Sequence, residues 1–497
     1  LKPFWLKARS RSRFTGGATR IFHSLFSRLG RCLQAALAVG AGKMATGAAV
    51  AAFFDGAISV ECRDTWARPW RLRHQDQAIY DPGLAAMASC AAVRIVLRTE
   101  GCSLRMVASA TTPEGVDKSA LQRAGGYPLE YELYVDGAFF DVKQLGAVEG
   151  EHKVIFEKLP EGSKLLELWL PAAMPLNVHS LDAGGQPIER PPEDSRPVWL
   201  CYGSSITHGG VSGSSPSSSW AAICARSAGV RLTNLGFGGE CMLDPEMARV
   251  IRDTPCDCIT LKVGINIVCV GALTARTFSA ALIGFIQTVR DGHPNTPLVV
   301  VSPIWFSPME SKAPVSAPQF LTLAQTRSKV KGVVEVLRQR GDTQLFYRDG
   351  LELLGEPEED LLYDKIHPCV EGHRLMGTRF AGLEFGPAGR LLPGRSKADP
   401  MAAAEPATGV AALKALMGIY ICEVPGGERC HIKIVESKGD YLAASNRRDW
   451  PPSILDARGD LIFLRTSPGV WGRVKDGKVI SFSNGIVWRR TESSSQP

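Results

Sequence analysis

Between Val198 and Leu383 the sequence alternates short apolar runs with longer amphipathic segments, and this alternation restricts the fold more than any other feature. The apolar runs are typical of buried strands, and they read VWLCY, VRLTNLGF, CDCITLKVG, PLVVVSPIW and TQLFYRD. Helical patterns separate them, notably SSWAAICARSAG, PEMARVIRD, ARTFSAALIGFIQTVRDG and PQFLTLAQTRSKVKGVVEVLRQRG. Strands joined by crossover helices form parallel sheets. We therefore predict an α/β domain over residues 196–390, with a doubly wound parallel sheet of five strands.

A chain of 497 residues is too long for a single hydrophobic core, so we expect further domains on both sides. Residues 60–190 contain short runs with partial alternation, such as AVRIVLRTEG and KLLELWLPA, separated by Gly, Pro and Asp turns. LYVDGAFFDV is typical of a hairpin around Asp136 and Gly137. These features predict a β-sandwich of jelly-roll type. A Pro- and Ala-rich linker over residues 391–410 then leads to a small β-rich domain over residues 411–497, whose role the pattern does not indicate.

The first 54 residues differ in composition from the rest of the chain. They contain nine Lys or Arg and no Asp or Glu, and they include the amphipathic piece IFHSLFSRLGRCLQAALAV. This composition is typical of an organelle transit peptide. A signal-peptide core, a disordered basic tail and a true start at Met44 are the alternatives. We expect residues 1–54 to lie outside the folded domains. We also expect an intracellular protein, which a transit peptide would direct to an organelle. Secretion is the alternative location.

Charge and cysteine content exclude several classes of function. Beyond residue 54 the chain holds 48 basic and 50 acidic residues and no basic stripe with interleaved aromatics, so we expect no nucleic-acid partner. No apolar stretch reaches about 18 residues without a charge, so no membrane span is predicted. The 13 cysteines form no CxxC pair, and Cys256 and Cys258 share one face of a predicted strand. We therefore expect neither a metal nor a cofactor, and the oligomeric state is not indicated.

The first predicted strand ends in a segment that suits a nucleophile. CYGSSITHGG spans residues 201–210 and places Ser205 at a strand end, where ligands bind in α/β proteins. A serine hydroxyl needs a base, and the base needs a third group to orient it. His367 lies in LLYDKIHPCVEGH after the fifth strand, and Asp364 precedes it by three residues. One turn of chain can bring the carboxylate to imidazole Nδ1, which leaves Nε2 facing the serine.

Two further strand ends offer donors for the oxyanion of acyl transfer. NLGFGGE after the second strand supplies the Gly239 N–H, with Gly238 as the alternative donor. KVGINI after the third strand supplies Asn266, whose side-chain amide can donate beside the Ser205 N–H, although an Asn there can also cap a helix. The alternatives for the catalytic pair are a plain loop serine at position 205 and a structural histidine at position 367.

Other polar residues near these segments are given lesser roles. His208 follows Ser205 by three residues, and its local spacing favours a lining or substrate-contact role over that of base. His373 lies on the helix predicted after the loop that carries Asp364 and His367, and we interpret it as structural. Glu240 lies in a position to line the pocket and is assigned no role.

Four of these segments together resemble a known family. YGSSITHGG, NLGFGGE, KVGIN and YDKIHP, in this order, are similar to the four sequence blocks of the SGNH, or GDSL-type, hydrolase superfamily. The resemblance covers residues 196–385 and implies a flavodoxin-like fold without metal or cofactor. It also implies a role for each matching residue, with Ser205 as nucleophile, Ser205, Gly239 and Asn266 as oxyanion donors, and Asp364 and His367 completing the triad.

Two positions depart from the family pattern. Ser204 stands where the family has the Asp of Gly-Asp-Ser, and Ile267 stands where it has the Asp of Gly-x-Asn-Asp. Both missing aspartates are supporting residues and not the triad acid, so the departures put the substrate in doubt more than the chemistry. The GxSxG elbow of α/β-hydrolases is absent from the sequence.

The preceding β-sandwich is similar to that of the two-domain carbohydrate acetyl-esterases of the superfamily. The resemblance therefore implies a serine esterase that removes small acyl groups, acetyl foremost, from a carbohydrate or similar polar substrate. The alternatives are a non-catalytic glycan-binding protein derived from a hydrolase, and a longer-chain lipase or thioesterase.

Overall fold

The computed structural model describes residues 44–111, 129–146, 150–172, 174–210, 215–313 and 319–392, and shorter stretches of the C-terminal part at 416–423, 429–437, 440–445, 453–458, 461–464, 471–475, 478–482 and 486–491. Residues 1–43 of the predicted N-terminal segment and residues 393–410 of the predicted linker lie outside the described residues. The bounds proposed for the domains remain predictions, apart from one correction at residues 44–54.

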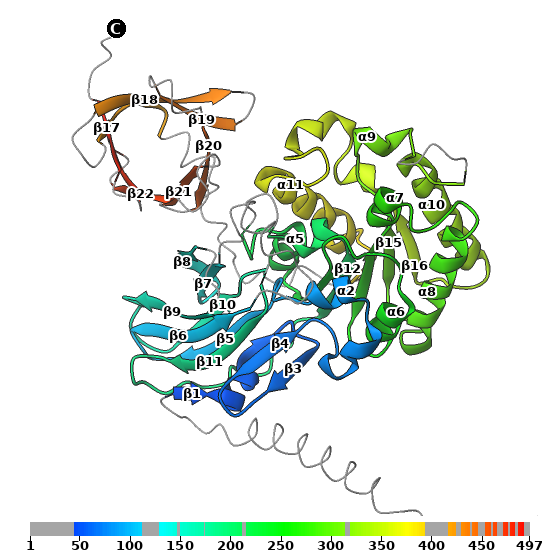
Figure 1. Ribbon diagram of the computed structural model, residues 1–497, viewed down its shortest axis with the longest axis horizontal. Coiled ribbons are helices and arrows are strands. Elements are labelled where there is room, and N and C mark those ends of the chain that lie inside the picture. The colour runs from blue at the N-terminus through cyan, green and yellow to red at the C-terminus, as the bar shows by residue number, and fades with distance from the viewer. Residues whose placement is uncertain are drawn as a thin grey trace, which may run out of the picture.

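The N-terminal domain consists of two antiparallel sheets around a shared core (Figure 1). Its strands are β1 (Met44–Thr46), β2 (Phe54–Asp55), β3 (Ser59–Cys62), β4 (Ala67–Trp70), β5 (Arg94–Thr99), β6 (Ser103–Ala110), β7 (Leu129–Val135), β8 (Ala138–Leu145), β9 (Gly150–Glu157), β10 (Lys164–Trp169) and β11 (Leu176–Asp182). One sheet has the order β3-β4-β11-β6-β9, with β1 beside β11, and the other has the order β2-β5-β10-β7-β8. Three short helices, η1 (Gly47–Phe53), η2 (His74–Ile79) and α2 (Pro82–Ala86), complete the domain.

Alternation along the strands builds this core. In β6, every second residue from Leu104 is buried, because successive side chains of a strand point to opposite faces. The predicted hairpin is confirmed: β7 and β8 pair, and Asp136 and Gly137 have φ values of 48° and 80° between them. Two consecutive positive φ values are what a tight turn between twisted strands requires.

The prediction for residues 44–54 was wrong. β1 pairs with β11 from Met44 onwards, and Val50 and Phe53 on η1 are buried in the sandwich core. The run from Gly47 to Phe53 has no polar side chain, so its composition alone does not distinguish a targeting segment from a buried helix.

The predicted five-stranded parallel sheet is confirmed, with the order β13-β12-β14-β15-β16. Its strands are β12 (Val198–Gly203), β13 (Arg231–Gly236), β14 (Cys258–Lys262), β15 (Leu298–Val301) and β16 (Leu345–Arg348). The helices are α4 (Ser205–His208), α5 (Trp220–Ala228), α6 (Pro245–Arg252), α7 (Ile265–Val270), α8 (Phe278–Gly292), α9 (Ser307–Glu310), α10 (Leu323–Gln339) and α11 (Val370–Phe380), with the short turns η3 (Gly350–Glu352), η4 (Glu356–Leu361) and η5 (Ala381–Phe385).

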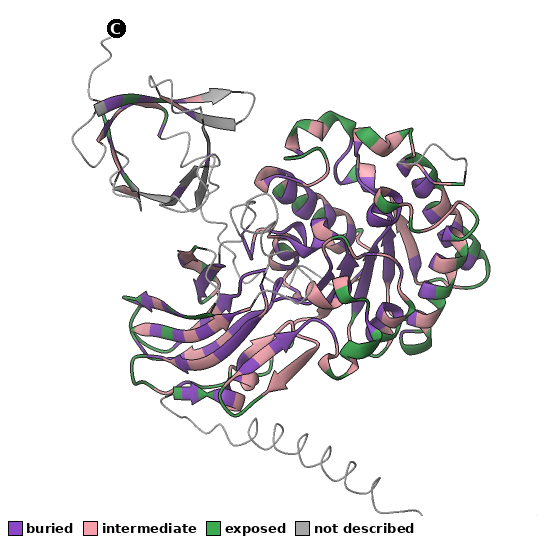
Figure 2. Ribbon diagram, in the orientation of Figure 1, coloured by how far each residue is buried: buried purple, intermediate pink, exposed green. Residues whose placement is uncertain are grey.

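Helices cover both faces of this sheet, which is why most residues of its strands are buried (Figure 2). Leu200 and Tyr202 of β12 pack in one core cluster with α6, α8 and α10. Trp199 and Cys201 point the other way and pack with α5 and α11.

The sandwich and the α/β domain share these clusters. Trp70, Leu72 and Leu84 of the sandwich domain are buried beside Phe237 of the α/β domain. On the other face, Trp169 of β10 belongs to the same cluster as Trp199. Apolar side chains therefore continue from one domain into the other, and the sandwich takes part in shaping the loops of the sheet.

The C-terminal strands form a closed antiparallel barrel. They are β17 (Gly418–Glu423), β18 (Arg429–Ser437), β19 (Asp440–Ser445), β20 (Ser453–Arg458), β21 (Leu461–Leu464), β22 (Trp471–Lys475), β23 (Val479–Phe482) and β24 (Val487–Arg490). The first and last strands pair and close the barrel around buried Tyr420 and Trp488. The sequence predicted a small β domain here but not its closure, because no local pattern encodes a contact between the first and last strands.

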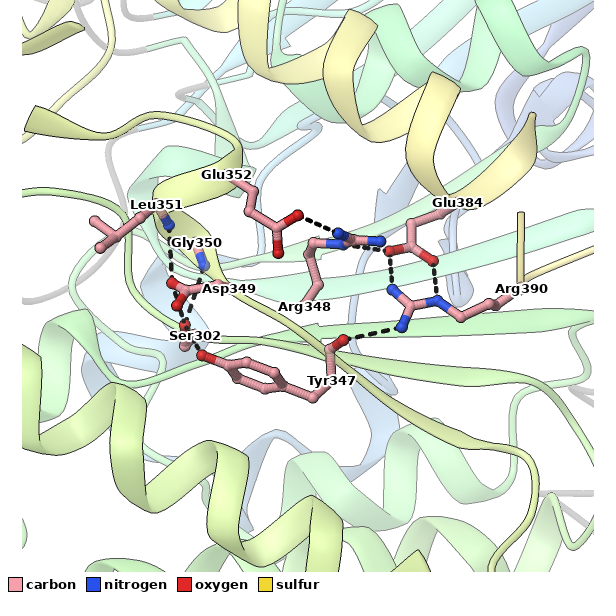
Figure 3. Close-up of polar contacts among 9 residues, drawn as sticks. All are labelled: Ser302, Tyr347, Arg348, Asp349, Gly350, Leu351, Glu352, Glu384 and Arg390. Carbon is pink, nitrogen blue, oxygen red and sulfur yellow. Dashed lines mark hydrogen bonds and ion pairs between the residues drawn. The ribbon is translucent and has the colours of Figure 1, made fainter. Parts of the chain in front are cut away.

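A buried carboxylate fixes the chain that follows α11. Glu384 on η5 is fully buried and accepts hydrogen bonds from Arg348 Nε at 2.7 Å and from Arg390 Nε at 2.9 Å (Figure 3). Arg390 also donates to the Tyr347 carbonyl at 3.0 Å. These contacts tie β16 to η5, and the segment between them carries Asp364 and His367.

We predict that Glu384→Gln lowers the free energy of unfolding by about 3 kcal/mol, because two arginines then lose their shared counter-charge. Glu352→Gln is the matched control: Glu352 also pairs with Arg348, but its side chain is 49% exposed, so about 0–1 kcal/mol is expected. Urea unfolding followed by tryptophan fluorescence measures both. Equal losses in the two variants would contradict this account of Glu384.

Candidate active site

Ser205 lies where the first strand of the parallel sheet ends and a helical turn begins. β12 ends at Gly203, and Ser204 caps α4 by accepting a hydrogen bond from the Ile206 N–H at 3.3 Å. Ser205 is therefore the first residue of α4, at the carboxyl edge of the sheet. This is the edge at which α/β proteins bind their ligands.

The structure brings Ser205, His367 and Asp364 together. Ser205 Oγ lies 2.8 Å from His367 Nε2, and His367 Nδ1 lies 2.7 Å from Asp364 Oδ2. The other carboxylate oxygen accepts from the backbone N–H groups of His367 at 2.7 Å and of Ile366 at 3.1 Å. Since a carboxylate can only accept, Nδ1 carries a proton and Nε2 is free to accept one from the serine.

Charge and hydrogen bonding keep Asp364 ionised. Burial raises the pKa of this carboxyl group, but the hydrogen bonds from His367 and Ile366 outweigh it and hold the pKa below its usual value. An ionised Asp364 fixes the tautomer of the imidazole and stabilises it when it becomes protonated. The arrangement is thus chemically capable of general-base activation of Ser205.

Two glycines let the Ser205 turn approach the end of β13. A Cβ atom on Gly236 would lie 2.2 Å from the His208 backbone N, and one on Gly203 would lie 2.3 Å from Thr207 Oγ1. Asn234 spans the same contact, because its side-chain amide donates to the Thr207 carbonyl at 2.9 Å. A larger residue at Gly236 would push the end of β13 away from the α4 backbone, and one at Gly203 would displace the Thr207 side chain.

Asn266 lies on α7, with its amide oriented by a backbone contact. Its Oδ1 accepts a hydrogen bond from the Cys241 N–H at 3.1 Å. Because the Cys241 N–H can only donate, the side-chain atom that faces it must be the amide oxygen of Asn266. The amide nitrogen Nδ2 therefore points elsewhere and is available as a donor. The alternative reading as a helix cap is not supported, because the residue that precedes α7 is Gly264 and Asn266 lies inside the helix.

Gly238 and Gly239 follow β13 beside Ser205. A Cβ atom on Gly238 would lie 3.8 Å from the Ser205 Cβ atom and 3.4 Å from Met87 Sδ. A Cβ atom on Gly239 would have no neighbour within 4 Å, and its φ is 78°. Gly238 therefore lies against the Ser205 turn, and Gly239 follows it with open space where a side chain would stand.

His208 is not the substrate-contact residue that the sequence favoured. Its ring is buried, its Nε2 lies 2.9 Å from the Ala172 carbonyl, and its Nδ1 lies 3.3 Å from Arg71 Nη2. Burial and the adjacent guanidinium lower its pKa to about 3, so the ring is neutral. Its spacing from Ser205 did not reveal that both ring nitrogens face the sandwich domain.

His373 and Glu240 are the two other polar residues that the sequence singled out. His373 is buried and accepts from the Trp220 N–H at 3.2 Å, in agreement with a structural role. Glu240 extends toward the sandwich domain, since a Cβ atom on Gly83 would lie 2.4 Å from its Oε1. Burial, with Asp81 and Asp244 nearby, raises the pKa of Glu240.

Sequence reasoning missed the residues that the sandwich domain brings to this edge. Met87 and Arg71 contact the loop after β13, although they precede it by well over a hundred positions. Neither lies in a motif, so no sequence signal could have identified them.

Other features of the described residues lie away from Ser205. A cavity of about 530 Å³ opens at the amino ends of β12 and β13, and its lining includes Asp55, Arg73 and Arg231 but none of the predicted site residues. Within the described ranges, no group of three or more His, Cys, Asp or Glu side chains is placed to hold a metal ion. No helix among the described residues is long and apolar enough to span a membrane.

Comparison with known proteins finds matches for the sandwich domain and for the α/β domain. The family model of the GDSL-like lipase/acylhydrolase family matches residues 196–377, and the model of the SsfX3 N-terminal domain matches residues 52–179. The solved structure of the salicylyl-acyltransferase SsfX3 from a tetracycline biosynthetic pathway is 32% identical, with a TM-score of 0.58, over 66% of this chain and 92% of that one. The chain belongs to the GDSL-like lipase/acylhydrolase family. This membership makes the protein an acyl ester hydrolase or an acyl-transferring enzyme.

Two more distant structures resemble this GDSL-like enzyme. A GDSL-like lipase from Bacteroides ovatus is 20% identical, with a TM-score of 0.53, over 66% of this chain and 93% of that one. A family two carbohydrate esterase from Clostridium thermocellum is 17% identical, with a TM-score of 0.46, over 59% of this chain and 92% of that one. Comparison with curated proteins found no match.

For this GDSL-like enzyme we predict that Asp364→Asn lowers kcat roughly 10⁴-fold, because an amide can stabilise the wrong imidazole tautomer. Asp360→Asn is the control, since Asp360 is an exposed carboxylate on the same segment and should leave kcat unchanged. Initial rates with p-nitrophenyl acetate and the circular dichroism of each variant test this. Full activity in a folded Asp364→Asn variant would exclude Asp364 as the orienting acid.

Proposed function

We propose that this protein is a serine esterase that removes small acyl groups, acetyl foremost, from a carbohydrate or similar polar alcohol. The observation that carries the proposal is the chain of contacts from Ser205 Oγ through His367 to Asp364, at 2.8 and 2.7 Å. The polar alcohol is proposed because a β-sandwich that precedes the four SGNH-like sequence blocks is similar to the arrangement in two-domain carbohydrate acetyl-esterases.

In the first half of the reaction, Ser205 Oγ attacks the carbonyl carbon of the ester. Its proton passes to His367 Nε2, and the carbonyl oxygen becomes an oxyanion. We assign the Ser205 N–H, the Gly239 N–H and Asn266 Nδ2 as donors to this oxyanion. Collapse of the tetrahedral intermediate breaks the C–O bond, and the leaving alkoxide takes the proton from His367.

In the second half, an acceptor hydroxyl attacks the acyl-Ser205 ester while His367 removes its proton. The bond between the acyl carbon and Ser205 Oγ then breaks, and His367 returns the proton to Oγ. Water as acceptor gives hydrolysis, and a second alcohol gives acyl transfer. The 32% identity to a salicylyl-acyltransferase over 92% of its length favours transfer as the second candidate function. Adding an acceptor alcohol to the assay separates the two, because transfer yields a new ester and hydrolysis yields the free acid.

We predict that a fluorophosphonate probe labels Ser205, since His367 activates its hydroxyl. Ser205→Ala should abolish both labelling and turnover of p-nitrophenyl acetate. Ser204→Ala, at the neighbouring buried serine, should still be labelled. A series of p-nitrophenyl esters from acetate to octanoate then measures the preferred acyl length. A folded wild-type protein that is neither labelled nor active would contradict the esterase and favour a glycan-binding protein without turnover, and a preference for octanoate would favour a lipase or thioesterase.

We predict that Asn266→Asp lowers kcat by about 10²–10³ with little change in KM, because the substitution removes the Nδ2 donor. Aspartate retains an oxygen for the Cys241 N–H, so the contact that orients the side chain survives. Asn266→Ala removes both and should be no more active. Steady-state kinetics of the two variants provide the test. An Asp variant with wild-type kcat would show that Asn266 serves structure alone.

A further inference from the structure

Arg71 is a fully buried arginine of the sandwich domain that uses all five of its donors. It follows β4, and none of its surface is exposed. A guanidinium has five N–H donors in a planar fork. Each finds an acceptor within the described residues, four of them backbone carbonyls: Nε donates to Ser89 O at 2.7 Å, Nη1 to Gly236 O at 2.5 Å and Asn234 O at 3.2 Å, and Nη2 to Met87 O at 2.5 Å and His208 Nδ1 at 3.3 Å.

These acceptors come from three parts of the molecule. Ser89 and Met87 belong to the sandwich domain, Asn234 and Gly236 to the end of β13, and His208 to α4. The stretch beyond Gly236 is the one that carries Gly238 and Gly239. One guanidinium therefore connects the sandwich, the helical turn of Ser205 and the loop that we assign to the oxyanion.

The charge of Arg71 has no carboxylate partner. No ion pair of Arg71 occurs among the described residues, and the carbonyl dipoles stand in for a counter-ion. Its carbon Cζ also lies 4.6 Å from the centre of the Phe237 ring, so the ring face adds to the compensation. Burial lowers the pKa of Arg71 to about 9, which leaves the group a cation at neutral pH.

We infer that Arg71 is a positioning residue of the reaction: it holds the loop that carries the oxyanion donors in register with Ser205. The inference rests on the proposed function, because it concerns the donors assigned there. Misplacing reacting groups by about 1 Å can cost roughly 100-fold in rate. The two hydrogen bonds from Arg71 to the Asn234 and Gly236 carbonyls fix the strand end from which this loop departs, and in this way they affect the chemical step.

The same contacts place a sandwich side chain at the site. The Met87 carbonyl accepts from Arg71, and Met87 Sδ lies against Gly238 next to Ser205. Without the guanidinium, the Met87 and Gly236 carbonyls would both lose a buried donor and would have to turn toward other partners. The expected effect is displacement of the loop and not a loss of substrate binding.

The test compares full-length Arg71→Met with Arg94→Met. Arg94 is a matched control because it is also a buried sandwich arginine, pairing with Asp55 and lying over Trp169, but it contacts none of the loops at Ser205. For each protein, kcat and KM for p-nitrophenyl acetate, the inhibition constant of phenylboronic acid and Tm are measured. Phenylboronic acid forms a tetrahedral adduct with an active serine, so its affinity reports on the oxyanion donors.

For Arg71→Met we expect kcat to fall and the phenylboronic acid inhibition constant to rise, each by about 10- to 100-fold, while KM changes less than about threefold. Arg94→Met should lower Tm and leave kcat and the inhibition constant unchanged. Arg71→Lys, which keeps the charge but has only three donors, should fold and show the same kinetic pattern as Arg71→Met.

Three results would overturn the inference. One is wild-type kcat in a folded Arg71→Met or Arg71→Lys variant. Another is a parallel fall of kcat in Arg94→Met, which would mean that any damage to the sandwich slows the reaction. The third is failure of both Arg71 variants to fold, since the residue would then serve stability alone. A wild-type protein without labelling or turnover would instead refute the proposed function, so the two failures are distinguishable.

Discussion

The candidate site depends on the close approach of the α4 backbone to Gly236 at the end of β13, where no side chain can intervene. Gly203 and Gly236 stand opposite each other in the register of these parallel strands, and each faces a helical turn at a distance that excludes a Cβ atom. The contact lets α4 sit directly against the β13 loop. Because β12 and β13 are neighbours, Ser205 and the glycines at positions 238 and 239 then occur at the same place on the carboxyl edge. His367 and Asp364 arrive from the far side of the sheet, after β16.

Two buried ionic arrangements hold this edge, and they differ in how the charge is compensated. Glu384 accepts from two arginines, which together neutralise it and anchor the chain beyond α11. Arg71 is compensated by carbonyl dipoles, so it retains positive charge next to the loop proposed to bind an oxyanion. The neutral His208 ring completes that arrangement by accepting from Arg71 and facing Ala172. An ion pair joins two side chains, whereas a guanidinium that donates to backbone carbonyls fixes the course of the chain itself.

The sequence allowed prediction of those parts of the site that follow from parallel topology. Once five strands are recognised, the segments after them must meet at one edge, and this brings Ser205 to within 2.8 Å of His367 although 162 positions separate them. Asp364 was predictable because it lies within one turn of His367. Contacts between domains were not predictable, since nothing in the neighbourhood of Arg71 or Met87 in the sequence indicates a partner near position 236. The same limitation misled the reading of His208, whose spacing from Ser205 suggested the pocket while its ring faces the sandwich.

In the proposed mechanism, the choice between hydrolysis and acyl transfer depends on a different part of the molecule from the proposed triad. There, both reactions share every step up to an acyl-Ser205 ester, so Ser205, His367 and Asp364 cannot discriminate between them. They diverge when an acceptor hydroxyl approaches that ester, and the outcome depends on the surface surrounding it. Met87 lies at Gly238 from the sandwich side, and Glu240 extends toward α2 of the same domain. The surroundings of Ser205 therefore include residues of both domains, whereas the predicted triad comes from the α/β domain alone.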